Sequence, residues 1–161
     1  MEAVAAKTEI TEGKFLTFIC GEEVYGIEIL KVREIIKLMD ITTVPRTPDY
    51  LKGVINLRGK VIPIINLRSK FSMQEIEHTQ ETCIIVVEVN QTSIGIIVDS
   101  VSEVSNIKGG EIEDAPHLGQ DVDTNFILGL GKTKERIVIL LDIEKVLSSE
   151  ELETVGQLAK E

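Results

Sequence analysis

The sequence predicts an all-β protein with minor helix, built as two small closed β-barrels. Three observations support this fold class. The chain contains an internal repeat, its apolar segments are short and rich in β-branched residues, and turn residues separate these segments. Because 43% of the 161 residues are hydrophobic, the chain can bury a core, either as one domain or as two small units that share one.

The repeat is seen when the sequence is aligned with itself at two different shifts. A first alignment lays Tyr25-Gly-Ile-x-Ile-x-x-Val-x-Glu-Ile35 over Ile94-Gly-Ile-x-Val-x-x-Val-x-Glu-Val104. A second alignment lays Gly53 over Gly129 and the apolar run 60–67 over 136–143. Two β-rich stretches can look alike by chance, but ordered matches in both blocks argue against this. We therefore interpret residues 15–71 and 84–147 as two copies of one unit, each marginal alone and expected to pack against the other.

The predicted strands begin with a hairpin. Lys14 to Cys20 and Val24 to Ile29 are β-branched segments joined by the turn residues 21–23. The segment from Leu30 to Ile36 is expected to form a helical turn. Val61 to Ile65 and Ile137 to Leu141 are apolar at nearly every position, so we expect both faces of these strands to be covered.

Short helices are also predicted after the last strand of each copy. Asn66 and Asp142 are placed to cap short helices over residues 67–71 and 143–147 by accepting hydrogen bonds from free backbone N–H groups. In the tail, Ser148 and Glu151 fit a capping box, and Leu147 with Leu152 fits its hydrophobic staple. A terminal helix is therefore expected to run to about Val155.

The predicted organisation has four segments. Residues 1–13 lack periodicity and are expected to be a flexible N-terminus. Residues 14–82 would form the first barrel, residues 83–147 the second barrel, and residues 148–161 the C-terminal helix and tail.

Composition excludes several functional classes. A net charge of −10 disfavours nucleic acid and anionic lipid as partners, and no apolar run is long enough for a membrane span or a signal peptide. Cys20 and Cys83 lack a CxxC spacing, and with only His78 and His117 there is no zinc ligand set. We expect a reduced, cytoplasmic protein without metal or other cofactor.

No catalytic motif stands out, so an enzyme is not expected. The serines lack a nucleophile elbow, and Gly129-Leu-Gly131 lacks the third glycine of a dinucleotide loop. The carboxylates between Glu111 and Asp123 lack the alternating spacing of a calcium loop, which leaves a solvated acidic loop or a negatively charged face for a partner.

The charges are unevenly distributed along the chain. Residues 31–70 hold nine Lys and Arg against three Asp and Glu, so a basic region lies inside an acidic protein. These charges can simply be solubilising. Arg58, however, lies in a turn between Leu57 and Gly59, where its planar guanidinium would be available to a carboxylate of a partner.

Three segments give the sequence its family resemblance: Tyr25 to Ile35, Thr47-Pro-Asp-Tyr-Leu-Lys-Gly-Val-Ile-Asn-Leu-Arg-Gly59, and Val61-Ile-Pro-Ile-Ile-Asn-Leu-Arg68. They resemble the bacterial chemotaxis coupling proteins, the CheW family, over residues 14–150. The resemblance implies two SH3-like five-stranded β-barrel subdomains, which agrees with the internal duplication. It also implies a non-catalytic adaptor or scaffold in signal transduction, which couples methyl-accepting chemoreceptors to the histidine kinase CheA, monomeric alone and assembled in arrays at the membrane through protein contacts.

The resemblance also implies which residues contact partners. The cytoplasmic hairpin tip of the receptor would meet a groove between the subdomains. Val32 and Val104 would supply apolar contacts, Gly53 would allow close backbone approach, and Arg58 would pair with receptor carboxylates, while Glu34 would orient Arg58 or meet a receptor cation. The full set of expected receptor-binding residues is Val32, Glu34, Gly53, Arg58, Cys83 and Val104. From the repeat alone, Val32 and Val104 could equally be core residues.

Two further contacts are expected on the same grounds. Ile41 and Val44, in a segment that Pro45 and Pro48 keep extended, would face the regulatory domain of CheA. A second contact that closes rings of adaptor and kinase would use Glu113, His117 and Leu118, although these residues depart from the basic and acidic-aromatic residues that can occupy such positions.

Two other classes of function stay open at this point. Small β-barrels often bind oligonucleotides, which would require a basic groove and salt-dependent binding. A small hydrolase with a split carboxylate site would depend on Glu34 or Glu103.

Overall fold

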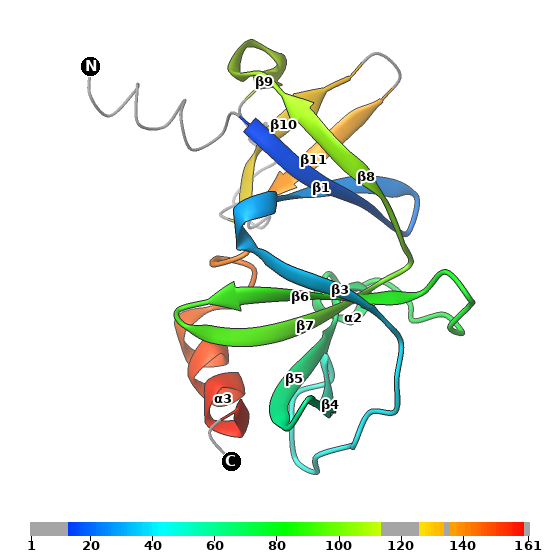
Figure 1. The fold of residues 1–161 in the computed structure, drawn as a ribbon, viewed down its shortest axis with the longest axis vertical. Helices are drawn as coiled ribbons and strands as arrows, with labels where there is room; N and C mark the ends of the chain where they lie inside the picture. The colour runs from blue at the N-terminus through cyan, green and yellow to red at the C-terminus, as the bar shows by residue number, and fades with distance from the viewer. Residues whose placement is uncertain (1–12, 114–125, 134–135, 160–161) are drawn as a thin grey trace.

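Two β-sheets stacked one above the other make up most of the molecule (Figure 1). The computed structural model describes residues 13–113, 126–133 and 136–159. We call sheet A the six-stranded sheet with the order β8-β1-β2-β11-β10-β9, and sheet B the five-stranded sheet with the order β3-β6-β7-β5-β4. The strands are β1 (Gly13–Cys20), β2 (Glu23–Glu28), β3 (Val32–Lys37), β4 (Leu51–Leu57), β5 (Lys60–Asn66), β6 (Cys83–Val89), β7 (Thr92–Val98), β8 (Ser100–Ile107), β9 (Ile112–Glu113), β10 (Ile127–Lys132) and β11 (Ile137–Leu141).

The duplication is confirmed by the sheet orders, and the structure adds that the two copies exchange strands. Sheet A combines β1 and β2, the first two strands of the first copy, with β8 to β11 of the second copy. Sheet B combines β6 and β7, the first two strands of the second copy, with β3 to β5 of the first copy. In sheet A, β2 of the first copy pairs in parallel with β11 of the second, and in sheet B, β7 of the second copy pairs in parallel with β5 of the first. Each sheet is therefore completed by strands of both copies.

This exchange corrects the predicted domain boundary between residues 82 and 83. Sheet B is formed by the continuous segment 32–98, whereas sheet A combines residues 13–28 with residues 100–141. The prediction was wrong because a repeat shows which segments are alike, but not whether a strand pairs within its own copy or with the other one. The predicted flexible N-terminus lies outside the described residues, except for Gly13, which pairs with Ile107 as the first residue of β1.

The predicted hairpin is confirmed, but the helical turn after it is shorter than expected. The 3-10 helix η1 covers only Ile29–Lys31, and the following residues form the edge strand β3. The helix predicted at residues 67–71 is confirmed as α2 (Leu67–Lys70), where the Asn66 side chain accepts a hydrogen bond from the Ser69 N–H at 3.2 Å. β-branched residues at positions 32, 35 and 36 explain the preference for strand over helix.

The helix predicted at residues 143–147 is wrong, because this segment forms turns. Asp142 Oδ1 accepts a hydrogen bond from the Glu144 N–H at 3.1 Å, which supports a turn and not a longer helix. The turns bury the side chains of Ile143, Val146 and Leu147 in the shared core. Core packing thus decided the local conformation here.

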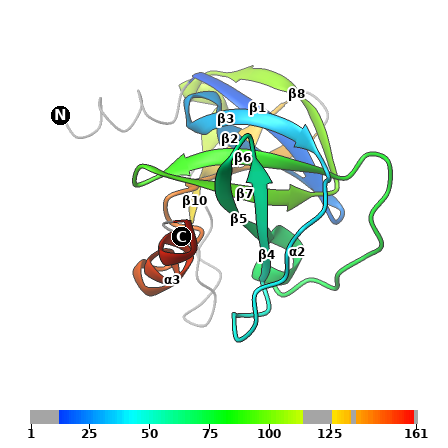
Figure 2. The ribbon, with the colours of Figure 1, turned by 60° about the horizontal axis from the view of Figure 1, so that its bottom comes forward.

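The C-terminal helix α3 (Ser149–Ala159) is longer than predicted and packs against β5 and β7 of sheet B (Figure 2). Its capping box is present, since the Ser148 N–H donates to Glu151 Oε1 at 2.7 Å and the Glu151 N–H donates to Ser148 Oγ at 3.2 Å. Val155 is fully buried and attaches the middle of the helix to the core. The helix ends at Ala159, beyond this buried residue.

We expect Ser148→Ala to lower the free energy of unfolding by about 1 kcal/mol, because the Glu151 N–H loses its acceptor. Urea denaturation followed by circular dichroism measures this difference. Ser148→Asp supplies another acceptor and should retain most of the stability. Equal stability of the alanine variant and the wild type would contradict a role of the cap.

The largest hydrophobic cluster joins the two sheets into one core. Phe18 and Ile27 of sheet A, Ile85 and Ile96 of sheet B, and Val155 of α3 all belong to it and are at most 3% exposed. Smaller clusters lie within each sheet. Within the described ranges, no helix is long and apolar enough to cross a membrane.

Candidate functional site

The predicted receptor-binding residues Val32, Glu34 and Val104 lie on β3 and β8, which are outer strands of sheets B and A. Strands β3 and β8 are also equivalent in the internal repeat. Val104 is 50% exposed, and its counterpart in the repeat, Ile35 on β3, is 44% exposed. Large apolar side chains so exposed on outer strands are candidates for contact with a partner.

Ile35 is therefore a candidate that the sequence reasoning missed. The signal was available, because the alignment that lays Tyr25 over Ile94 also lays Ile35 over Val104. What it lacked was the exposure of the two side chains, which the repeat alone does not show.

Arg58 and Glu34 form an ion pair across sheet B. Arg58 lies in the turn between β4 and β5 with a φ of 53°, and its Nη2 donates to Oε1 of Glu34 on β3. Because β3 and β4 are the two outer strands of sheet B, the pair connects its two edges. The side chain of Arg58 is 70% exposed, so Glu34 orients a guanidinium that still has donors facing solvent.

Val32 and Cys83 lie where the two sheets meet. Both are half-buried, and both pack against the shared core together with Val101 of β8. Burial raises the pKa of the Cys83 thiol, and a backbone hydrogen bond from Val101 acts in the opposite direction. This contact places Cys83 of sheet B beside a strand of sheet A.

Gly53 is buried, and its close backbone contact is made by the protein itself. Its φ is 141°, and a Cβ at this position would lie 2.0 Å from the carbonyl oxygen of Thr42. Thr42 and Val54 exchange two backbone hydrogen bonds at 2.8 and 2.9 Å, so the segment before β4 crosses directly over the glycine. Gly129 has a similar arrangement with the carbonyl oxygen of Glu113, at 2.8 Å from a Cβ.

Ile41, one of the two predicted kinase-contact residues, directly precedes Thr42 in the segment that passes over Gly53. It is half-buried and packs against the sheet B cluster, together with Ile36, Leu38 and Leu57. Val44, the other predicted kinase residue, is half-buried, and its carbonyl accepts a hydrogen bond from the Thr47 hydroxyl at 3.0 Å.

Glu113 lies on the segment of sheet A that passes over Gly129. It is exposed, and its Oε1 accepts a hydrogen bond from Lys132 Nζ at 2.5 Å. His117 and Leu118, the other predicted array residues, lie outside the described residues. Glu113 thus corresponds to Thr42, the neighbour of Ile41, because the carbonyl oxygens of Glu113 and Thr42 face Gly129 and Gly53 in the same way.

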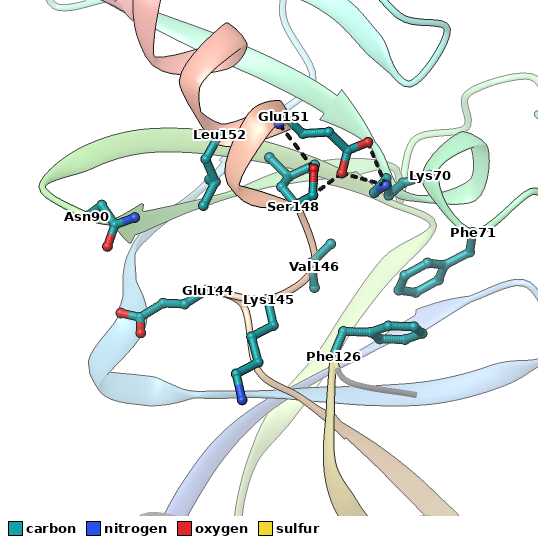
Figure 3. Close-up of a pocket in the computed structure, with 11 residues that line it drawn as sticks. Lys70, Phe71, Asn90, Phe126, Glu144, Lys145, Val146, Ser148, Glu151 and Leu152 are labelled. Carbon is teal, nitrogen blue, oxygen red and sulfur yellow. Dashed lines mark hydrogen bonds and ion pairs between the residues drawn. The ribbon is translucent and has the colours of Figure 1, made fainter. Parts of the chain in front are cut away.

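A pocket with a volume of about 730 Å³ lies beside α3 (Figure 3). The rings of Phe71 and Phe126 stack at 5.1 Å along one side, and the Lys70–Glu151 ion pair lies along another. None of the predicted site residues that the structure describes is among those lining it. Over the same described ranges, no three His, Cys, Asp or Glu side chains gather closely enough to hold a metal ion.

Comparisons with known proteins agree on one family. A family model described as the CheW-like domain matches residues 14–151. The chain is 46% identical to a chemotaxis protein CheW of Klebsiella aerogenes over 147 residues, which cover 91% of this chain and 89% of that protein. It is 38% identical to a chemotaxis protein CheW of Helicobacter pylori over 137 residues, which cover 85% and 82% of the two chains.

The fold has a solved counterpart. The crystal structure of the scaffolding protein TtCheW from Thermoanaerobacter tengcongensis superposes with a TM-score of 0.79 at 35% sequence identity. The superposition covers 88% of this chain and 97% of that one.

Proposed function

The chain belongs to the CheW-like family of chemotaxis adaptors, and from this membership we propose that it couples chemoreceptors to the histidine kinase CheA without catalysing a reaction. The cytoplasmic hairpin tip of a receptor would bind one set of residues, and the regulatory domain of the kinase would bind another. The protein would work in the cytoplasm, held at membrane-anchored receptor arrays by these contacts and monomeric when alone.

The observation that carries the receptor site is the exposed guanidinium of Arg58, which Glu34 orients at the edge of sheet B. A planar guanidinium can bind a carboxylate through two hydrogen bonds. Ile35 follows Glu34 on the same strand and adds exposed apolar surface. A helical hairpin with acidic and apolar side chains would find both kinds of contact here.

The surface around Ile41 supports the proposed kinase contact. Ile36, Leu38 and Leu57 pack against the same buried cluster as Ile41 and are only partly buried, so they offer apolar area that a folded domain could cover. This residue set shares no member with the proposed receptor set. Glu113 and, by the resemblance, His117 and Leu118 would supply the second contact that closes rings of adaptor and kinase.

Control of the kinase then requires only binding. If the adaptor binds two kinase states with different affinities, a receptor that shifts the adaptor's geometry shifts the population of those states. No proton, metal or covalent intermediate is needed.

The first experiment is size-exclusion chromatography with light scattering of the protein mixed with a chemoreceptor cytoplasmic fragment and the CheA regulatory domain. We expect binary complexes with each partner and a ternary complex with both. Binding to neither partner by a folded protein would contradict the proposal.

Two variants test the separate residue sets. Arg58→Glu should weaken receptor binding about 30-fold, because a charge central to an interface contributes about 2 kcal/mol or more, and leave kinase binding unchanged. Ile41→Asp should have the reverse selectivity. Titration calorimetry with each partner measures both.

Lys145→Glu is a matched control for Arg58→Glu, because Lys145 is 63% exposed and reaches its acidic neighbour Asp142 only at 3.9 Å. It should bind both partners as the wild type does. An exposed ion pair such as Arg58–Glu34 adds at most about 1 kcal/mol to the free energy of unfolding. The Arg58→Glu variant should therefore unfold at nearly the same urea concentration as the wild type. Equal loss of both partners in Arg58→Glu would rule out separate sites.

A further inference from the structure

The chain passes between the two sheets at two short crossings, and an ion pair lies at each of them. η1 leads from β2 of sheet A to β3 of sheet B, and the single residue Asp99 leads from β7 of sheet B to β8 of sheet A. In Figure 1 these two crossings lie on opposite sides of the region where the two sheets meet. Any change in the orientation of one sheet relative to the other has to bend the chain at these two places.

Asp99 is held far more firmly than an ordinary surface carboxylate. Its Oδ1 accepts from Arg68 Nε at 2.9 Å, and its Oδ2 accepts from Arg68 Nη2 at 2.6 Å and from the Gly21 N–H at 2.9 Å. The side chains of Arg68 and Asp99 are 16% and 20% exposed. The Asp99 N–H also donates to the Ile19 carbonyl at 3.0 Å.

These bonds connect both sheets through one carboxylate. Gly21 belongs to the β1–β2 turn of sheet A, whereas Arg68 lies on α2 directly after β5 of sheet B. Arg68 is itself fixed by a third bond, from Nη1 to the Gln74 carbonyl at 3.0 Å. Hydrogen bonding from Arg68 holds the pKa of Asp99 below its usual range, so the carboxylate is charged at neutral pH.

The crossing at η1 has a weaker pair of opposite polarity. Lys31 Nζ donates to Glu144 Oε2 at 3.0 Å, and the two side chains are 36% and 46% exposed. Glu144 is the counterpart of Arg68 in the alignment that lays Gly53 over Gly129, so an acid stands where the first copy has a base. The crossing at Asp99 is therefore fixed by a largely buried, bidentate ion pair. The crossing at η1 has a single, more exposed contact, which solvent and salt weaken.

We propose that the Arg68–Asp99 pair is a latch that fixes the orientation of the two sheets and thereby positions the partner-binding residues at their junction. Val101 follows Asp99 by two residues and makes the backbone hydrogen bond to Cys83, and Val104 lies on the same strand. A shift of β8 at Asp99 therefore moves Val101 and Val104 relative to Cys83 and Val32. Neither Arg68 nor Asp99 has to touch a partner, so both are positioning residues. The effect on binding rests on the proposed receptor contact, whereas the latch itself does not.

Cys83 supplies a readout that needs no partner. Its thiol lies at the junction of the sheets, so a change in their orientation alters its access to a thiol reagent. Labelling of the native protein with N-ethylmaleimide, followed by peptide mass spectrometry, measures the rate at Cys83 separately from that at Cys20, which is buried in the core.

The experiment compares Asp99→Asn and the conservative Arg68→Lys with Glu144→Gln, the matched control at the other crossing. Urea unfolding first establishes that each variant is folded. We expect Asp99→Asn to raise the Cys83 labelling rate several-fold and to weaken binding of the chemoreceptor fragment about 3- to 30-fold, with a smaller effect for Arg68→Lys. Glu144→Gln should change neither quantity by more than about twofold.

A reversed pair tests whether the interaction itself matters. Arg68→Glu combined with Asp99→Lys reproduces the polarity found at Lys31 and Glu144, and it should recover part of the slow labelling and of the affinity that each single change removes. Folded Asp99→Asn protein with wild-type labelling and wild-type affinity would overturn the latch. Faster labelling with unchanged affinity would overturn its positioning role. If the wild type does not bind the receptor fragment, the proposed function fails, and the labelling rates still decide the latch.

Discussion

Residues 1–82 and residues 83–161, produced as separate fragments, are expected to stay unfolded alone and to form a β-rich complex when mixed. Each fragment contains one copy of the repeat, yet each sheet needs strands from both copies. In the first fragment, the β1–β2 hairpin would lack its neighbours β8 and β11, and an isolated two-stranded hairpin is marginal in water. Far-UV circular dichroism and size-exclusion chromatography of the fragments and of their mixture measure the effect.

A third fragment provides the matched control. Residues 29–98 are slightly shorter than 1–82 but contain all five strands of sheet B, together with η1 and α2. This fragment should show more β-structure than 1–82, although it lacks the α3 packing. Cooperative unfolding of 1–82 alone would contradict the requirement for strand exchange.

Gly53→Ala is expected to lower the free energy of unfolding by about 2 to 4 kcal/mol. The alanine would adopt a φ of 141°, where side chains are strained, and its Cβ would overlap the Thr42 carbonyl. To relieve the overlap, the segment that carries Ile41 must move away from β4, so binding of the CheA regulatory domain should weaken as well. Urea denaturation and calorimetry with the kinase domain measure the two effects.

Two other glycines separate strain from overlap. Gly59 has a φ of 86° with open space around its Cβ position, and Gly110 has open space and no such φ. Gly59→Ala should cost about 1 kcal/mol from backbone strain alone, and Gly110→Ala should be nearly neutral. If Gly53→Ala were no more destabilising than Gly59→Ala, the crossing of Thr42 over Gly53 would not be rigid.

The candidate site was predicted in its residue types more than in its arrangement. The turn position of Arg58 and its possible partner Glu34 were both identified from the sequence, and the two side chains meet. Ile35 was missed because the exposure of an apolar residue on an outer strand depends on which strand covers it. Gly53 was expected to allow a partner's close approach, and the structure shows that Thr42 of the same chain occupies that place. The roles of these residues in binding stay predictions.

The sequence by itself determined the all-β class, the two copies, the β1–β2 hairpin, the Asn66 cap and the Ser148–Glu151 capping box. All of these depend on residues close together in the chain, or on similarity between two segments. Only the tertiary structure decided that the copies exchange strands, that residues 143–147 form turns, and that Arg68 and Asp99 meet at a crossing between the sheets. These features depend on pairings between residues distant in the chain, where local preferences are equal for both copies and burial of the shared core selects the arrangement.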